Sequence, residues 1–222
     1  MNDLVVKKSE LLEPSKFANE AALQATASDS QYLAYIQLMY ATSNLVTDGK
    51  QSLGDFVLME GQADMSLTKS FDCVCLSWRP RAMSYGEGTV SIFNPESPEF
   101  LTIRDRALNR VRNNAFGKEF LLYLPDYDRL ALYFFGNLSG RNEAPNMTAI
   151  LDEQNAGDAY ILVNVSSQIV GKKDRYPVPV VKKSESVLSR FVDDDRLRAA
   201  LNIFNNPKDT EIESVDEDTR DR

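Results

Sequence analysis

Residues 71–81 read FDCVCLSWRPR, and this stretch predicts a central β-strand that ends in an aromatic and basic motif. Its aliphatic, aromatic and cysteine side chains are typical of a buried strand. Cys73 and Cys75, the only cysteines of the chain, lie two residues apart and should project from one face of that strand. Two cysteines are too few for a zinc site, so we expect small buried side chains rather than a disulfide or metal ligands.

Strand and helix signals continue on both sides of this stretch. Further strands are predicted at residues 54–65, 89–93, 120–124, 130–135, 160–165 and 176–181. Helices are predicted at residues 14–23, 30–47, 97–117, 146–154 and 185–204. Pro177 and Pro179 place the last strand at a sheet edge, because proline cannot donate a ladder hydrogen bond.

The helix predicted after Ser97-Pro98 has the clearest local pattern. Phe100, Ile103, Ala107 and Val111 share one helical face, and Gly117 is the expected end of the helix. An earlier pattern, Leu33, Ile36 and Tyr40, has the spacing of a helix that ends before Asp48.

This order of elements predicts a mainly β (α+β) fold. We expect an OB-like Greek-key barrel with a helix between strands three and four, two N-terminal helices and one C-terminal helix. A β-sandwich with inserted helices would give a similar order. The expected organisation is an N-terminal helical segment (1–50), the barrel (51–185), a C-terminal helix (186–204) and a disordered acidic tail (205–222).

Composition excludes several classes of function. The chain has no histidine, which removes Ser-His-Asp and Cys-His catalysis and most zinc or iron sites. No P-loop and no GxGxxG motif is present. No apolar run is long enough for a membrane span. We therefore expect a binding protein of the cytoplasm, with no enzymatic activity, no cofactor, no metal and no membrane contact.

The net charge of −8 is unevenly distributed. Residues 1–59 carry 7 acids and 4 bases, residues 60–190 carry 16 of each, and residues 191–222 carry 10 acids and 5 bases. Basic residues are concentrated at 104–118 and 172–190, within the balanced part. A nucleic-acid partner is therefore compatible with the acidic total, because phosphate contacts depend on local cations.

Aromatic and basic residues alternate in three places, which is the pattern that sequence-independent binding of single strands requires. Bases stack on the flat rings while cations follow the phosphates. The candidate nucleic-acid-binding residues are Trp78, Arg79, Arg81, Tyr85, Tyr133, Phe135, Arg141, Lys172, Lys173, Arg175, Tyr176 and Lys182. Each aromatic residue taken singly has a second interpretation, as packing in the core or at its rim.

The layout resembles the replicative single-stranded-DNA-binding proteins of tailed phages. The resemblance rests on Gly54-Asp55, on Trp78-Arg79-Pro80 at the end of a strand, on the late hairpin 172–176 and on the acidic tail. It implies an OB fold, single-stranded DNA as ligand, and a tail that recruits replication proteins and competes with DNA for the basic groove. For a phage-encoded protein, the location would be the host cytoplasm.

Our prediction from the sequence is sequence-independent single-stranded-DNA binding in phage replication or recombination. The alternative is a virion structural or assembly protein that binds other protein subunits. The sequence also leaves a homo-oligomer open. Exposed rings beside cations would favour the first function, because a structural protein does not need them.

Overall fold

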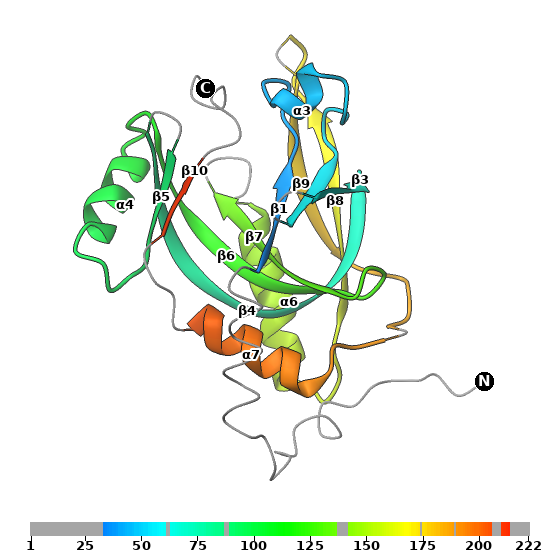
Figure 1. The fold of residues 1–222 in the computed structure, drawn as a ribbon. Helices are drawn as coiled ribbons and strands as arrows, with labels where there is room; N and C mark the ends of the chain where they lie inside the picture. The colour runs from blue at the N-terminus through cyan, green and yellow to red at the C-terminus, as the bar shows by residue number, and fades with distance from the viewer. Residues whose placement is uncertain are drawn as a thin grey trace.

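The computed structural model describes residues 33–60, 63–86, 89–136, 142–173, 175–188, 190–205 and 210–213. Within these ranges the fold is mixed α+β, built on one ten-stranded sheet that curls into a half-barrel (Figure 1). Eight strands follow the order β10-β5-β4-β6-β7-β1-β2-β3, and β8 joins β4 to β9. The helix predicted at 14–23 lies outside the described residues.

The elements have the following bounds. The strands are β1 (Ala34–Leu38), β2 (Phe56–Glu60), β3 (Ala63–Thr68), β4 (Ser70–Tyr85), β5 (Thr89–Phe93), β6 (Asn114–Leu124), β7 (Arg129–Gly136), β8 (Leu162–Val170), β9 (Tyr176–Lys183) and β10 (Thr210–Glu213). The helices in the described residues are α3 (Asn44–Thr47), α4 (Phe100–Leu108), α6 (Glu143–Ala156) and α7 (Asp194–Asn205).

Strand β4 organises the sheet and confirms the strand predicted from FDCVCLSW. It is 16 residues long, about twice as long as predicted. Its first part pairs with β8, its last part pairs with β5, and it pairs with β6 from Val74 to Ser84. A register shift between Cys75 and Ser77 bends it where it passes from one partner set to the other. The sheet can curl because one bent strand serves both halves.

The largest hydrophobic cluster fills the inside of the curl. It takes side chains from eight strands and from α6, which covers the opening with Ala144, Met147, Ile150 and Leu151. Cys73 and Cys75 are both free and buried there, as predicted. Burial raises the pKa of each thiol, so neither forms a thiolate at neutral pH.

Helix α7 packs on the opposite face of the sheet. Its Ala200 and Phe204 contact Leu121 of β6 and Leu132 of β7. The predicted C-terminal helix is therefore present, but it begins at Asp194 rather than near residue 185. Asp193 sets this start, because its carboxylate accepts a hydrogen bond of 2.9 Å from the Arg196 amide.

The helix predicted at 30–47 is wrong over most of its length. Ala34, Ile36 and Leu38 form a strand whose side chains alternate between buried and half-buried. β1 runs antiparallel to β2 and parallel to β7, so both of its edges are paired, and Ala34, Ile36 and Leu38 pack in the cluster inside the curl. A short apolar segment can fit both the two-residue period of a strand and the 3.6-residue period of a helix. Whether it forms a strand or a helix then depends on the segments that pack against it.

Helix α4 confirms the buried face predicted for it, through Phe100, Ile103 and Ala107. The helix ends at Leu108, however, and Val111 is 47% exposed. Gly117 does not end the helix but lies in β6, where a Cβ would meet the Phe135 carbonyl oxygen at 2.1 Å. Because α4 follows β5, it does not lie between strands three and four as predicted.

The sheet edge at β9 is closed to further pairing. β9 pairs only with β8, which confirms the edge position predicted from its prolines. The Val181 amide points away from β8 and donates to Glu143 Oε2 at 2.8 Å. The backbone nitrogens of Pro177 and Pro179 point to the same side as the Val181 amide, because the three residues alternate along the strand. These two nitrogens carry no hydrogen to donate.

The acidic tail is partly a strand. Thr210–Glu213 forms β10 and runs antiparallel to β5, so the disorder predicted for the tail is wrong for these four residues. An exposed strand edge offers backbone hydrogen bonds whatever the side chains are. The backbone hydrogen bonds to β5 therefore stabilise a segment that has few apolar residues to bury.

Candidate functional site: two clusters of aromatic and basic residues

Alternation along β4 separates three predicted site residues, Trp78, Arg79 and Arg81. Trp78 lies opposite Phe120 of β6, whereas Arg79 lies opposite Glu119. Successive side chains of a strand point to opposite faces, so Trp78 lies on the face of α6 and the two arginines lie on the face of α7. The three residues therefore lie in two different environments.

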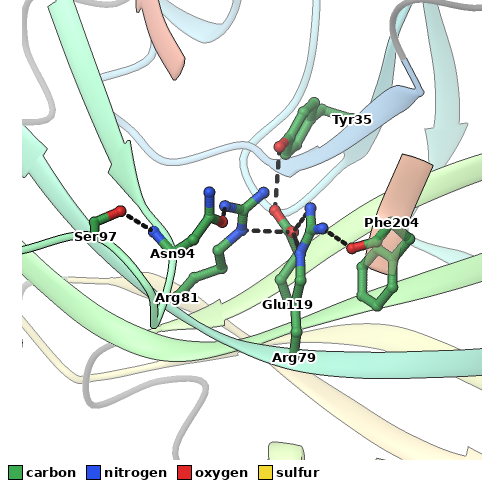
Figure 2. Close-up of polar contacts among 7 residues, drawn as sticks. All are labelled: Tyr35, Arg79, Arg81, Asn94, Ser97, Glu119 and Phe204. Carbon is green, nitrogen blue, oxygen red and sulfur yellow. Dashed lines mark hydrogen bonds and ion pairs between the residues drawn. The ribbon is translucent and has the colours of Figure 1, made fainter. Parts of the chain in front are cut away.

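On the α7 face, two arginines converge on one carboxylate (Figure 2). Glu119 is fully buried and Arg81 is 4% exposed. Glu119 Oε2 accepts hydrogen bonds from Arg79 Nε at 2.7 Å and from Arg81 Nε at 2.8 Å. Arg79 Nη2 is 2.6 Å from the same oxygen. We call these three residues, with Tyr35, Asn94 and Phe204, the arginine–glutamate network.

The other residues of the network connect further segments of the chain to Glu119 and the two arginines. The Tyr35 hydroxyl donates to Glu119 Oε1 at 3.1 Å and ties β1 to β6. Arg79 donates to the carbonyl oxygen of Phe204, and its guanidinium carbon lies 4.0 Å from the centre of the Phe204 ring. A cation at the C-terminal end of a helix is favoured by the exposed carbonyls there. Arg79 therefore anchors the end of α7.

Arg81 fixes the segment that follows β5. It donates to the side-chain oxygen of Asn94, which is itself buried. The backbone N–H of Asn94 donates to Ser97 Oγ at 3.1 Å, just before α4 (Figure 2). One buried carboxylate thus joins β1, β4, β6, α7 and the approach to α4.

The network carries two positive charges and one negative charge. Burial lowers the pKa of the Arg79 guanidinium, while the Glu119 carboxylate beside it acts in the opposite direction. Burial and the same carboxylate raise the pKa of Tyr35, so its hydroxyl stays a neutral donor. The predicted role of Arg79 and Arg81 as phosphate contacts is therefore replaced by a buried ion network.

Trp78, on the other face, remains accessible. The residue is 37% exposed, and Lys118 Nζ lies 3.9 Å from the centre of its ring. Lys118 also donates to Thr148 Oγ1 of α6 at 2.9 Å. Lys118, which the candidate set did not include, is brought to Trp78 by the β4–β6 register and by no sequence motif.

Three other candidate aromatics are engaged in packing. Tyr133 is 4% and Phe135 is 2% exposed, and their ring centres are 4.6 Å apart in an edge-to-face contact. Both belong to the cluster inside the curl, which corrects their interpretation as stacking residues. Tyr85 is half-buried beside Met83, and Arg141 lies outside the described residues.

The β8–β9 hairpin keeps its candidate residues at the surface. Lys172, Lys173 and Arg175 are exposed at its tip, and Lys182 is exposed further along β9. Tyr176 is 44% exposed. It borders a cavity of about 400 Å³ that Val178, Gln168 and Glu143 also line.

The predicted residues consequently do not form one site. In the β4–β8 register, Ser70 pairs with Ser166, so the hairpin tip near Gly171 and Trp78 lie on opposite sides of this pair. They are about 13 residues apart along the strands, or roughly 40 Å of strand length. The hairpin and the Trp78–Lys118 pair are separate surfaces.

The described residues contain no group of three or more His, Cys, Asp or Glu side chains that could hold a metal ion. None of the helices among them is both long enough and apolar enough to cross a membrane. No protein-family model, curated protein or solved structure matches the chain, so its function is inferred from its own chemistry.

Proposed function

We propose that this chain binds single-stranded DNA, without sequence preference, through the β8–β9 hairpin. The observation that carries the proposal is the group of exposed cations Lys172, Lys173 and Arg175 beside the exposed ring of Tyr176. Among the described residues, no carboxylate pairs with these cations. Exposed cations are available to phosphates, and an exposed ring is available to a base.

The chemistry of the hairpin suits a flexible single strand better than a duplex. A duplex keeps its bases stacked inside, so a tyrosine ring can add little to the phosphate contacts. Single-stranded bases are free to stack on the Tyr176 ring, and Lys182 continues the positive charge along β9. Trp78, which is 37% exposed, offers a second aromatic platform for a long strand, although its neighbour Lys118 is already engaged with the Trp78 ring and with Thr148.

We further propose an OB-like core made of β4, β6, β7, α6, β8 and β9. These elements give three strands, a helix and two strands in chain order, with β4 pairing both β6 and β8. In this interpretation α6 takes the place between strands three and four, and β5 with α4 is an insertion. The β8–β9 loop would then be the last loop of the barrel, one of the loops with which OB folds hold oligonucleotides.

Binding of fluorescent oligothymidine, followed by anisotropy at several salt concentrations, tests the proposal. We expect binding that weakens as salt rises and that is much stronger than binding of duplex. The double variant Lys172→Ala/Lys173→Ala should lower the slope of log affinity against log salt by about 1.4, at roughly 0.7 for each contact. The matched control Lys50→Ala/Arg106→Ala removes two exposed cations elsewhere and should leave the slope unchanged. Equal effects of the two pairs would contradict the proposal.

Tyr176→Ala tests the stacking contribution separately. It should weaken oligothymidine binding by about 1–3 kcal/mol, the usual value of one base-aromatic stack. Tyr176→Phe keeps the flat ring and should bind nearly as well as the wild type. A loss in Tyr176→Phe as large as that in Tyr176→Ala would show that the hydroxyl acts instead of the ring.

The second candidate function is assembly with other protein subunits. The observation in its favour is that Leu101, Leu108 and Val111, on and just after α4, are each about half exposed. Self-association without any binding of oligothymidine at low salt would favour this function over the first.

A further inference from the structure

The outer side of α4 presents apolar residues to solvent. Leu101 is 55%, Leu108 is 49% and Val111 is 47% exposed. The helix already buries Phe100, Ile103 and Ala107 against β4 and β6, so these outer residues form a second apolar surface. An isolated exposed leucine needs no explanation, but two on one helix, with an exposed valine just after it, suggest a contact surface.

Two charged residues lie between the two exposed leucines of α4. Residues three, four and seven apart share a helical face, so Leu101, Arg104, Asp105 and Leu108 form one stripe. Within the chain, Arg104 Nη2 pairs with Asp105 Oδ1 at 2.8 Å, with side-chain exposures of 36% and 58%. Both charged groups therefore remain accessible to a partner.

The stripe is self-complementary about its centre. Read in either direction, it gives leucine, charged residue, charged residue, leucine, and the two charges are opposite in sign. The symmetry extends outward, because exposed Pro98 before the helix mirrors exposed Val111 after it. A two-fold axis between Arg104 and Asp105 would place each residue of the stripe against a complementary residue of the second copy.

From this pattern we infer that two copies of the chain associate through antiparallel α4 helices. Leu101 of each copy would pack on Leu108 of the other, and Arg104 of each would pair with Asp105 of the other. A two-fold interface uses the same patch on both copies and must therefore be complementary to itself. The α4 stripe satisfies this requirement without any other segment.

The size of the stripe sets the strength of the association. A nine-residue helix is only about 13 Å long, and its outer side covers less than the roughly 800 Å² per partner of a standard interface. We therefore expect a reversible dimer that forms as concentration rises from micromolar to millimolar. This inference does not depend on DNA binding.

Sedimentation velocity over a concentration series, without DNA, tests the inference by charge reversal. Arg104→Asp and Asp105→Arg each place like charges together twice across the two-fold axis. Each should raise the dimer dissociation constant by roughly tenfold or more, because like-charge contacts are costly. The double variant Arg104→Asp/Asp105→Arg restores complementarity and should recover most of the dimer.

An equimolar mixture of the two single variants is the sharpest arm of the experiment. At the centre of the stripe, one variant then carries two acids and the other carries two arginines. The heterodimer should therefore form at concentrations at which neither variant forms a homodimer. A wild type that stays monomeric at millimolar concentration would overturn the inference. So would single variants that dimerise normally, or a mixture and double variant that recover nothing.

Leu108→Gln provides a readout that does not depend on charge. It should also shift the equilibrium to monomer while circular dichroism stays unchanged, since the residue is half exposed. Leu45→Gln, a half-buried leucine on α3, is the control and should leave the dimer intact. An unchanged dimer in Leu108→Gln would place the contact elsewhere.

Discussion

The arginine–glutamate network and the β8–β9 hairpin look alike in the sequence and differ in the structure. Both place aromatic residues beside cations on or near a strand. Arg79 and Arg81 lie within the β4–β6 pairing, opposite a strand that carries Glu119. Lys172, Lys173 and Arg175 lie beyond the last pair of the β8–β9 ladder. The strand register decides whether a cation meets a buried carboxylate or remains available to a ligand.

The largest expected effect is loss of stability when the network loses its only carboxylate. Glu119→Ala leaves two arginines without their partner and should lower the free energy of unfolding by about 3–5 kcal/mol. The matched control is Glu153→Ala, which removes the exposed partner of Lys183 and should cost no more than about 1 kcal/mol. Urea denaturation measures both. Similar costs for the two variants would show that the network does not hold the fold together.

The next largest expected effect is a loss of folding stability at alkaline pH, caused by buried tyrosines. Burial raises the pKa of Tyr35 and Tyr133, and raises that of Tyr85 to about 12. A tyrosine ionises near pH 10 when unfolded, so the folded state binds more protons above that pH. Stability is therefore fully present below pH 10 and falls by up to about 1.4 kcal/mol per pH unit for each such tyrosine.

Urea midpoints measured at pH 8, 10 and 11 check this expectation. The midpoint should stay level up to pH 10 and fall between pH 10 and 11. Tyr35→Phe removes one of the three groups and should make that fall shallower. An identical fall in Tyr35→Phe would show that this tyrosine does not contribute.

Trp78 should show an intermediate effect. About a third of its side chain is exposed, so Trp78→Ala should cost about 1–2 kcal/mol, less than a core aromatic truncation. Phe135→Ala is the core control and should cost about 3–5 kcal/mol. Trp78 is the only tryptophan, so quenching of its fluorescence by oligothymidine would also show whether DNA reaches this second platform. A Trp78→Ala variant as unstable as Phe135→Ala would make Trp78 a core residue.

The smallest expected effect is on the stability of the hairpin variants. Lys172→Ala/Lys173→Ala should change the free energy of unfolding by no more than about 0.5 kcal/mol, as exposed substitutions usually do. The same variant should change the salt dependence of oligothymidine binding. A large stability loss would mean that these lysines, like Arg79 and Arg81, hold the fold together.

Prediction from the sequence succeeded where local chemistry decides the outcome. The strand from Phe71, the inner face of α4 and the edge position of β9 follow from residue type, periodicity and the missing amide of proline. The exposure of the hairpin cations was predictable for a similar reason, because a glycine and several adjacent charges at 171–175 cannot be buried together.

Prediction failed where two distant segments decide the outcome together. Residues 34–38 fit a helix equally well, and they form a strand because β2 and β7 pair with both of its edges. Tyr133 and Phe135 resembled exposed rings because nothing near them in sequence shows that they point into the curl. The same holds for Thr210–Glu213, which is a strand because β5 offers it a free edge.

The sequence by itself determined that the chain lacks histidine chemistry, that it is built mainly of strands around 71–81, and that cations gather in its middle. These properties belong to residue types and to their spacing. Only the tertiary structure decided which cations are neutralised. Glu119 lies 40 residues beyond Arg79 and reaches it through the pairing of β4 with β6. That pairing depends on the register of whole strands, which no local pattern records.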